Sequence, residues 1–222
     1  KQKIDSDLVE VGFEREKAKK RVDFLNNISW EKGECLEIGF GQGLFLHELQ
    51  KIGIDKLNGF EPNNSSFEYA SNQLMLGNKA LLINDFPDID EKISEPNVSL
   101  VVMFHVLEHL HQPLSLLQWI RKSYENANLM LELPLFENLA NHIGSDHFHF
   151  GHHSYFNRYS LENLLYKCGY IIKYAQESES DEFYPGQIRV FCKPVKSNDG
   201  GYIKTQKISY NYAKQKVEAL NK

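Results

Sequence analysis

The sequence predicts an α/β fold with a seven-stranded, mostly parallel sheet, helices on both faces and an antiparallel hairpin at its C-terminal end. From Glu34 onward, short apolar runs alternate with stretches of helical periodicity, which is typical of a parallel sheet built from βαβ units. The last two runs are separated by an acidic stretch and a Tyr-Pro-Gly turn signal, and this arrangement predicts the hairpin.

Each element can be assigned to a range of residues. Five apolar runs predict the first five strands, at Cys35–Phe40, Leu57–Phe60, Ala80–Ile83, Val98–Phe104 and Leu129–Leu133. Helices are expected between them at Leu44–Lys51, Ser65–Leu76 and Pro113–Tyr124. A further helix at Leu161–Lys167 ends before Gly169, a residue suited to a helix C-cap. The last two strands follow at Tyr170–Ala175 and Ile188–Cys192.

The chain divides into three parts. Its 222 residues suffice for one α/β domain, which we expect at residues 34–195. Residues 1–33 carry apolar positions at mostly helical spacing among many charges, so they are expected to form a helical flank or lid. Residues 196–222 are expected to be a linker and a polar tail. This tail and the missing initiator Met indicate a piece of a longer chain.

Composition excludes several classes of protein. No apolar run approaches the length of a bilayer span and no signal pattern is visible, so we expect a cytoplasmic protein without a membrane span. The formal net charge of −5, without a basic patch, argues against a nucleic-acid partner. Three separated cysteines in apolar surroundings are expected to be reduced core residues. We therefore expect a monomer or homodimer that acts on a small molecule.

A glycine-rich segment ends the first predicted strand and opens a helix. This glycine loop, residues 37–43 (EIGFGQG), has the context that a nucleotide-binding loop requires. Glycines at alternate positions allow sharp turns and a close approach of the backbone to a ligand. The GxGxG spacing differs from the GxGxxG of dinucleotide enzymes. Glu61 ends the second strand, where a carboxylate can accept hydrogen bonds from both hydroxyls of a ribose.

Two more features follow the third and fourth strands. Asp85 comes directly after the third strand, where it or the backbone of Phe86 could meet an adenine edge. The fourth strand runs into His105–Leu110, with the sequence HVLEHL. For Glu108 and His109, packing and capping beside a site and direct catalysis both remain open.

Taken in this order, the glycine loop, the two acids and the VLEHL segment resemble class I S-adenosylmethionine-dependent methyltransferases over residues 33–193. The resemblance implies a Rossmann-like fold and S-adenosylmethionine as the cofactor. It assigns the glycine loop to the methionine portion, the strand-two acid to the ribose, the acid after strand three to adenine, and the segment after strand four to the reaction centre. The implied cofactor-binding residues are Glu37, Gly39, Gly41, Gly43, Glu61, Asp85, Phe86 and His105.

Histidines are concentrated between the fifth strand and the last helix. Five of the nine fall within twelve residues: His142, His147, His149, His152 and His153. Residues 148–165 resemble the HxxYF…SLxxLL signature of methyltransferases that tailor sugars, antibiotics and surface polysaccharides. In such folds this segment builds the acceptor pocket at the carboxyl ends of the strands. Gly151 stands where that subgroup usually has an acid.

The resemblance makes His152 the expected catalytic base or acceptor-orienting residue, because an imidazole titrates near neutral pH. His149 and His105 are further catalytic candidates, and the expected acceptor-binding residues are His147, His153 and Tyr155. Pocket-wall packing is an alternative role for each imidazole. Imidazoles near a carboxylate such as Asp146 are also metal-ligand types. Because neither HExxH nor paired CxxC spacing is present, no metal is predicted.

The resemblance implies methyl transfer to a small polar acceptor, most specifically an oxygen of a sugar, nucleotide sugar or related surface-polysaccharide intermediate. A quinone or natural-product methyltransferase is an alternative, since VLEHL segments occur there too. A non-catalytic interaction or metal-binding module that retains the fold is another. The presence of Glu37, Glu61 and Asp85 argues against loss of cofactor binding.

Overall fold

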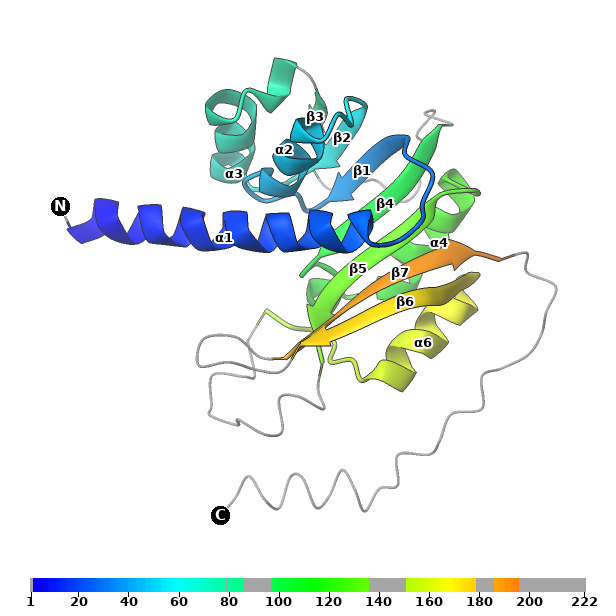
Figure 1. The fold of residues 1–222 in the computed structure, drawn as a ribbon. Helices are drawn as coiled ribbons and strands as arrows, with labels where there is room; N and C mark the ends of the chain where they lie inside the picture. The colour runs from blue at the N-terminus through cyan, green and yellow to red at the C-terminus, as the bar shows by residue number, and fades with distance from the viewer. Residues whose placement is uncertain (1, 79, 86–96, 136–150, 179–185, 196–222) are drawn as a thin grey trace, which may run out of the picture. The chain divides into compact units, whose positions relative to one another are not determined.

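The computed structural model describes residues 2–78, 80–85, 97–135, 151–178 and 186–195. The strands form one seven-stranded sheet in the order β3-β2-β1-β4-β5-β7-β6, which confirms the expected sheet and its C-terminal hairpin (Figure 1). The chain divides into two compact units, residues 1–103 and residues 104–222. No helix among the described residues is long and apolar enough to cross a bilayer.

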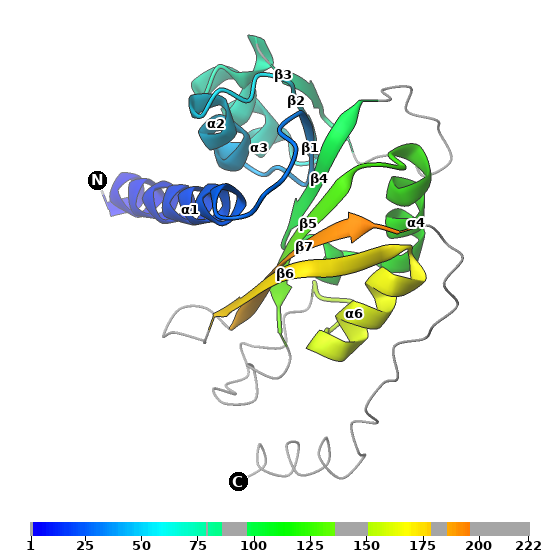
Figure 2. The same cartoon turned by 45° about the vertical axis from the view of Figure 1, so that its right-hand side comes forward.

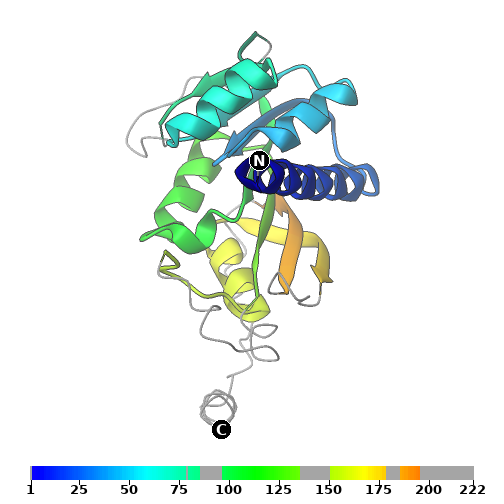
Figure 3. The ribbon, with the colours of Figure 1, turned by 90° about the vertical axis from the view of Figure 1, so that its left-hand side faces the viewer.

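The first unit contains the glycine loop and the strands around it. Its elements are α1 (Gln2–Asn26), β1 (Glu34–Ile38), α2 (Leu44–Lys51), β2 (Leu57–Phe60), α3 (Asn64–Glu68), β3 (Ala80–Ile83) and most of β4 (Val98–Phe104). β1 pairs in parallel with β2 and β4, and β2 pairs in parallel with β3. The expected N-terminal flank is the single helix α1, which packs against α2 (Figure 3).

The helix expected at Ser65–Leu76 is broken into three pieces. α3 begins after Asn63, whose side chain accepts a hydrogen bond from Ser66 N at 3.0 Å. A π-helical turn at Tyr69–Gln73 and a 3-10 turn at Leu76–Asn78 replace the rest of the predicted helix. Between them Met75 has a φ of 56°, a left-handed conformation that ends the regular helix. Apolar periodicity alone does not reveal such a change of helix type.

The second unit contains a 3-10 turn at Leu107–His109, α4 (Pro113–Ser123), β5 (Asn128–Pro134), α6 (Arg158–Lys167), β6 (Tyr170–Ser178) and β7 (Gln187–Pro194). β7 pairs antiparallel with both β5 and β6, and α6 covers β6 (Figure 2). A capping box between Asn157 and Ser160 starts α6, and Gly169 follows its end with a φ of 80°, as a helix C-cap requires.

β6 extends three residues beyond the apolar run that predicted it. Its ladder with β7 continues to the pair Ser178 and Gln187, although the residues after Lys173 are mostly polar and exposed. Backbone pairing holds this end of the hairpin, so its side chains need not be apolar. The three cysteines, Cys35, Cys168 and Cys192, are free and buried, as predicted.

Candidate active site

The glycine loop has the backbone geometry that its sequence predicts. Gly39, Gly41 and Gly43 all have positive φ, at 74°, 53° and 73°. A Cβ at Gly43 would lie 2.8 Å from the side chain of Ala70, so this position packs directly against the π-helical turn. A Cβ at Gly41 would meet nothing within 4 Å. Gly43 is therefore required by packing, whereas Gly41 leaves open space beside the backbone, as a ligand-binding loop needs.

Glu61 joins the glycine loop to the ends of two neighbouring strands. Its buried carboxylate accepts hydrogen bonds from Gly41 N at 2.7 Å and from Asn63 N at 2.8 Å. Asn84 Nδ2 donates to the carbonyl oxygen of Glu61 at 2.8 Å. The two backbone donors use only half of the lone-pair sites of the carboxylate, so the expected ribose hydroxyls still have acceptors. The sequence gives no sign that Glu61 also holds the loop, or that Asn63 and Asn84 support it.

Glu37 is a buried acid at the start of the glycine loop. Its side chain is 2% exposed, and Oε2 has no hydrogen-bond partner among the described residues. Burial raises the pKa of this carboxyl well above its usual range; Arg21 of α1 opposes the shift and Glu61 adds to it. A buried oxygen without a partner is costly, and a cationic ligand group would satisfy it. The buried acid, the open space at Gly41 and the spare acceptors of Glu61 therefore suit the expected cofactor.

The remaining cofactor positions of the first unit lie at the end of β3. Asp85 is exposed there, directly after the strand. Phe86 lies outside the described residues.

In the second unit, His105 lies among buried charges. Its backbone has a φ of 55°, and its N–H donates to Glu132 O at 2.8 Å. Nδ1 lies 3.3 Å from Glu108 Oε1, and Nε2 lies 3.4 Å from Glu132 Oε1 and 3.2 Å from Gln187 Oε1. Desolvation disfavours the charged ring, but the two facing carboxylates outweigh it and raise the pKa of His105 to about 9. At neutral pH His105 is therefore a cation and lacks the lone pair that a base needs.

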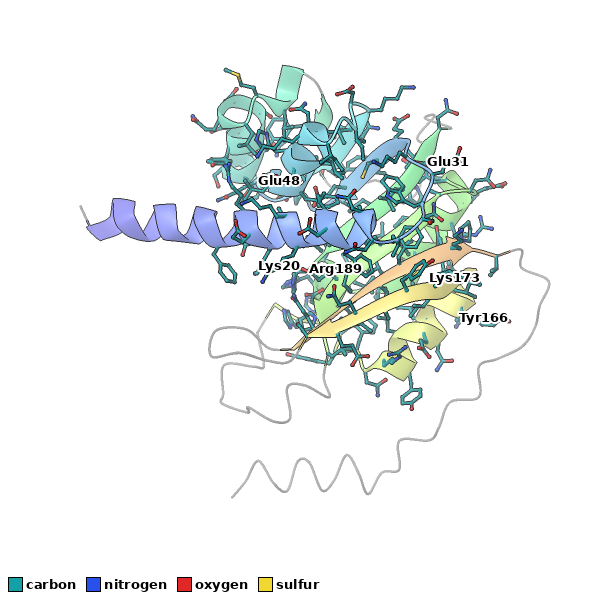
Figure 4. The ribbon with its side chains drawn as sticks, in the orientation of Figure 1. Lys20, Glu31, Glu48, Tyr166, Lys173 and Arg189 are labelled. Atoms are coloured by element: carbon teal, nitrogen blue, oxygen red, sulfur yellow. The ribbon has the colours of Figure 1, made fainter. Side chains whose placement is uncertain are left out.

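Arg189 is a second cation beside His105, Glu108 and Glu132. Arg189 on β7 (Figure 4) donates to Glu132 through Nε at 2.7 Å and through Nη2, and its Nη1 donates to Gln176 at 3.2 Å. Glu132 and Arg189 are direct partners in the β5–β7 register, and both side chains are buried. Two cations and the carboxylates of Glu108 and Glu132 thus compensate each other, as buried charges must. The sequence does not predict the pairing of Glu132 with Arg189, since cross-strand register is not visible in apolar runs.

Four histidines of the second unit gather beside Glu108, and we call Glu108, His109, His111, His152 and His153 the histidine cluster. The rings of His109 and His152 are 4.6 Å apart between centroids and nearly perpendicular, at 76°. The rings of His111 and His153 are 3.7 Å apart, and Tyr155 lies 5.7 Å from His152. The expected candidates His147 and His149 lie outside the described residues.

Backbone hydrogen bonds hold the two segments of the cluster together. Glu108 O accepts from His153 N at 2.8 Å and from Ser154 N at 3.1 Å. His109 Nδ1 lies 2.8 Å from Gly151 O, and since a carbonyl can only accept, Nδ1 carries the proton. The sequence left the role of Glu108 and His109 open. The structure brings both to His152, the predicted catalytic residue.

Comparisons with known proteins agree with the fold. Residues 11–173 match the family model described as a methyltransferase domain. No curated protein matches the chain. Among solved structures, a chain of the complex between the Haloferax volcanii Trm112 methyltransferase activator and a putative methyltransferase is similar at a TM-score of 0.66 and 12% identity, covering 84% of this chain and 92% of that one.

Two further similar structures differ in their substrates. Magnesium protoporphyrin IX methyltransferase from Synechocystis PCC 6803 with bound SAH has a TM-score of 0.61 and 14% identity, covering 81% of this chain and 83% of that one. Mitomycin 7-O-methyltransferase has a TM-score of 0.57 and 16% identity, covering 74% of this chain and 49% of that one. At these identities the likeness shows the fold alone. The family model, which spans most of the chain, shows that the chain belongs to the methyltransferase domain family and is an S-adenosylmethionine-dependent methyltransferase.

Proposed function

We propose that this methyltransferase modifies a hydroxyl oxygen of a small polar acceptor, namely a sugar, a nucleotide sugar or a related surface-polysaccharide intermediate. The observation that carries the proposal is the pair of imidazoles, His109 and His152, beside buried Glu108. A hydroxyl must lose its proton on methylation, and these groups suit that task. His152 also belongs to the segment that resembles the sugar-tailoring subgroup.

The cofactor contacts are assigned to the glycine loop and its acids. Glu37 receives the ammonium group of the methionine portion, because its Oε2 lacks a partner among the described residues. Glu61 accepts from the ribose hydroxyls with its remaining lone pairs, and Asp85 and Phe86 keep their assignment to adenine. When bound, S-adenosylmethionine supplies an electrophilic methyl group: an oxygen–carbon bond forms, the carbon–sulfur bond breaks with its electron pair returning to sulfur, and the hydroxyl proton is released.

The released proton is assigned to His152 and its neighbours. A neutral imidazole has a lone pair that can accept a proton, so His152 suits this role. His105 does not, because the raised pKa keeps it protonated. In this proposal His153 and Tyr155 contact the acceptor. From its composition, we also propose that the protein is a cytoplasmic monomer or homodimer.

The acceptor is tested by mass spectrometry. Purified protein and S-adenosylmethionine are incubated with nucleotide sugars and sugar phosphates, and with quinones and phenolic natural products as competing classes. We expect the gain of one methyl group in the sugar class. Methylation of the quinones or phenols alone would contradict the proposed acceptor and leave the methyltransferase itself in place.

A further inference from the structure

We propose that Glu108, His109 and His152 bind a divalent transition-metal ion. One ligand atom from each of these three residues lies within 4.8 Å of the other two. Two imidazole nitrogens and one carboxylate oxygen form a donor set typical of Zn²⁺, Fe²⁺ or Co²⁺, rather than of Ca²⁺ or Mg²⁺, which prefer oxygen alone.

Glu108 supplies the independent observation that points to a cation. Its side chain is 2% exposed, and neither carboxylate oxygen has a hydrogen-bond partner among the described residues. Oε1 faces His105 Nδ1 at 3.3 Å, an ion pair without hydrogen-bond alignment. Buried carboxylates are normally paired and hydrogen-bonded, so this one is incompletely satisfied. A metal ion on Oε2 completes it while Oε1 keeps its contact with His105.

His109 is oriented as metal-binding histidines usually are. Its Nδ1–H donates to Gly151 O at 2.8 Å, so the lone pair of the ring lies on Nε2. Metal-ligating histidines commonly donate their other N–H to a backbone carbonyl, which fixes the tautomer and the ring orientation. The ring of His152, 4.6 Å away and nearly perpendicular, approaches the same place from the other segment.

The backbone fixes the two segments that carry the ligands, and only small side-chain movements are needed. Glu108 O accepts from both His153 N and Ser154 N, which places residue 152 beside residues 108 and 109. Ligand atoms about 2.1 Å from a tetrahedral metal ion are about 3.4 Å apart, so the longest separation must shorten by up to about 1.4 Å. Ring and carboxylate rotation can supply this. Three protein ligands leave a coordination position open, as in catalytic rather than structural sites.

The role of the metal rests on the proposed function, because its open position would take the acceptor hydroxyl. A bound cation would lower the pKa of such a hydroxyl, so that its proton would pass to solvent water. His152 would then act as a metal ligand, in place of the base role proposed above. The sequence predicts no metal because it contains no HExxH or paired CxxC spacing, in which the ligands lie close together in sequence. His152, in contrast, comes from a segment far from Glu108 and His109.

Zinc binding to the chelator-treated chain, without cofactor or acceptor, tests the site. We expect one Zn²⁺ per chain by calorimetry, a higher Tm with Zn²⁺, and the visible absorption of low-symmetry Co²⁺ after substitution. Glu108→Gln, His109→Asn and His152→Asn should each weaken Zn²⁺ binding by more than about 100-fold, beyond the loss usual for outer-shell changes. His109→Asn is chosen because an Asn amide can still donate to Gly151 O.

The control is His111→Asn, which alters a histidine of the same cluster outside the proposed ligands and should leave Zn²⁺ affinity unchanged. No zinc binding by the wild type, equal affinity in all three ligand variants, or a loss confined to His111→Asn would overturn the metal site. The proposed function fails separately: zinc binding that depends on the three ligands supports the metal site even if no sugar is methylated. Sugar methylation by a chain that binds no zinc overturns the metal site alone.

Discussion

Two buried glutamates, one in each unit, differ in how completely the protein satisfies them. Glu61 in the first unit accepts a backbone N–H on each carboxylate oxygen. Glu108 in the second unit is more deeply buried, yet neither oxygen has a hydrogen-bond partner among the described residues. The hydrogen bonds of Glu61 thus hold the glycine loop without a ligand, whereas the Glu108 carboxylate needs a ligand to satisfy its oxygens. A satisfied carboxylate stabilises the fold, and an unsatisfied one indicates where binding energy is available.

The largest expected effect is on turnover, through His152. His152→Ala should lower single-turnover methyl transfer by roughly 10²–10⁴-fold, because proton removal from the acceptor is lost whether His152 acts as a base or as a metal ligand. Cofactor affinity, measured by calorimetry, should stay unchanged. His111→Ala is the matched control and should keep its rate. Normal activity per folded molecule in His152→Ala would reduce His152 to a packing residue.

The next largest effect is expected on cofactor binding, through Glu61. Glu61→Ala deletes the acceptor of Gly41 N and of the ribose hydroxyls, so S-adenosylmethionine affinity should fall by about 1.5–3 kcal/mol in calorimetry. The exposed Glu68→Ala on α3 is the control and should bind normally. If both variants bind alike, the ribose contact lies elsewhere.

Substitutions at Gly43 and Gly41 should separate an effect on packing from an effect on cofactor binding. Gly43→Ala should lose more stability than Gly41→Ala, because both variants carry a left-handed strain of about 1–2 kcal/mol but only the first also clashes with Ala70. Chemical denaturation measures the difference. Gly41→Ala should instead weaken S-adenosylmethionine binding. Equal stability of the two variants would mean that the contact with Ala70 relaxes freely.

The smallest expected effect concerns Glu37 and depends on pH. The folded state holds the Glu37 proton to higher pH than the unfolded chain does, because burial raises the pKa of the carboxyl. The stability of the ligand-free protein should therefore fall as pH rises above the ordinary glutamate pKa. Glu37→Gln should remove this loss, a gain on the order of 1 kcal/mol at neutral pH that disappears in acid.

Thermal melts from pH 4 to pH 8 measure this gain, and the same variant should bind S-adenosylmethionine more weakly. If the melting temperature of Glu37→Gln changes with pH in parallel with that of the wild type, Glu37 keeps its ordinary pKa in the fold.

The sequence predicts the first unit better than the second, for a physical reason. Gly41 and Glu61 belong to short patterns at strand ends, and parallel strands bring those ends together without further information. Cross-strand register decides the pairing of Glu132 with Arg189, and apolar periodicity does not report register. His105 shows the same limit. It is a catalytic candidate in the sequence, but two carboxylates from separate segments make it a cation.

His105 and the three charged side chains around it restrict which substitutions this region can accept during evolution. The half-buried His105 and the buried Glu108, Glu132 and Arg189 balance one another, so the loss of any one leaves an uncompensated charge. Single substitutions are therefore harmful, while paired ones, such as replacement of Glu132 and Arg189 by apolar residues together, can be neutral. Among homologous chains these positions should covary rather than drift independently, and a lineage that lost His105 should carry a compensating change at one of the two glutamates.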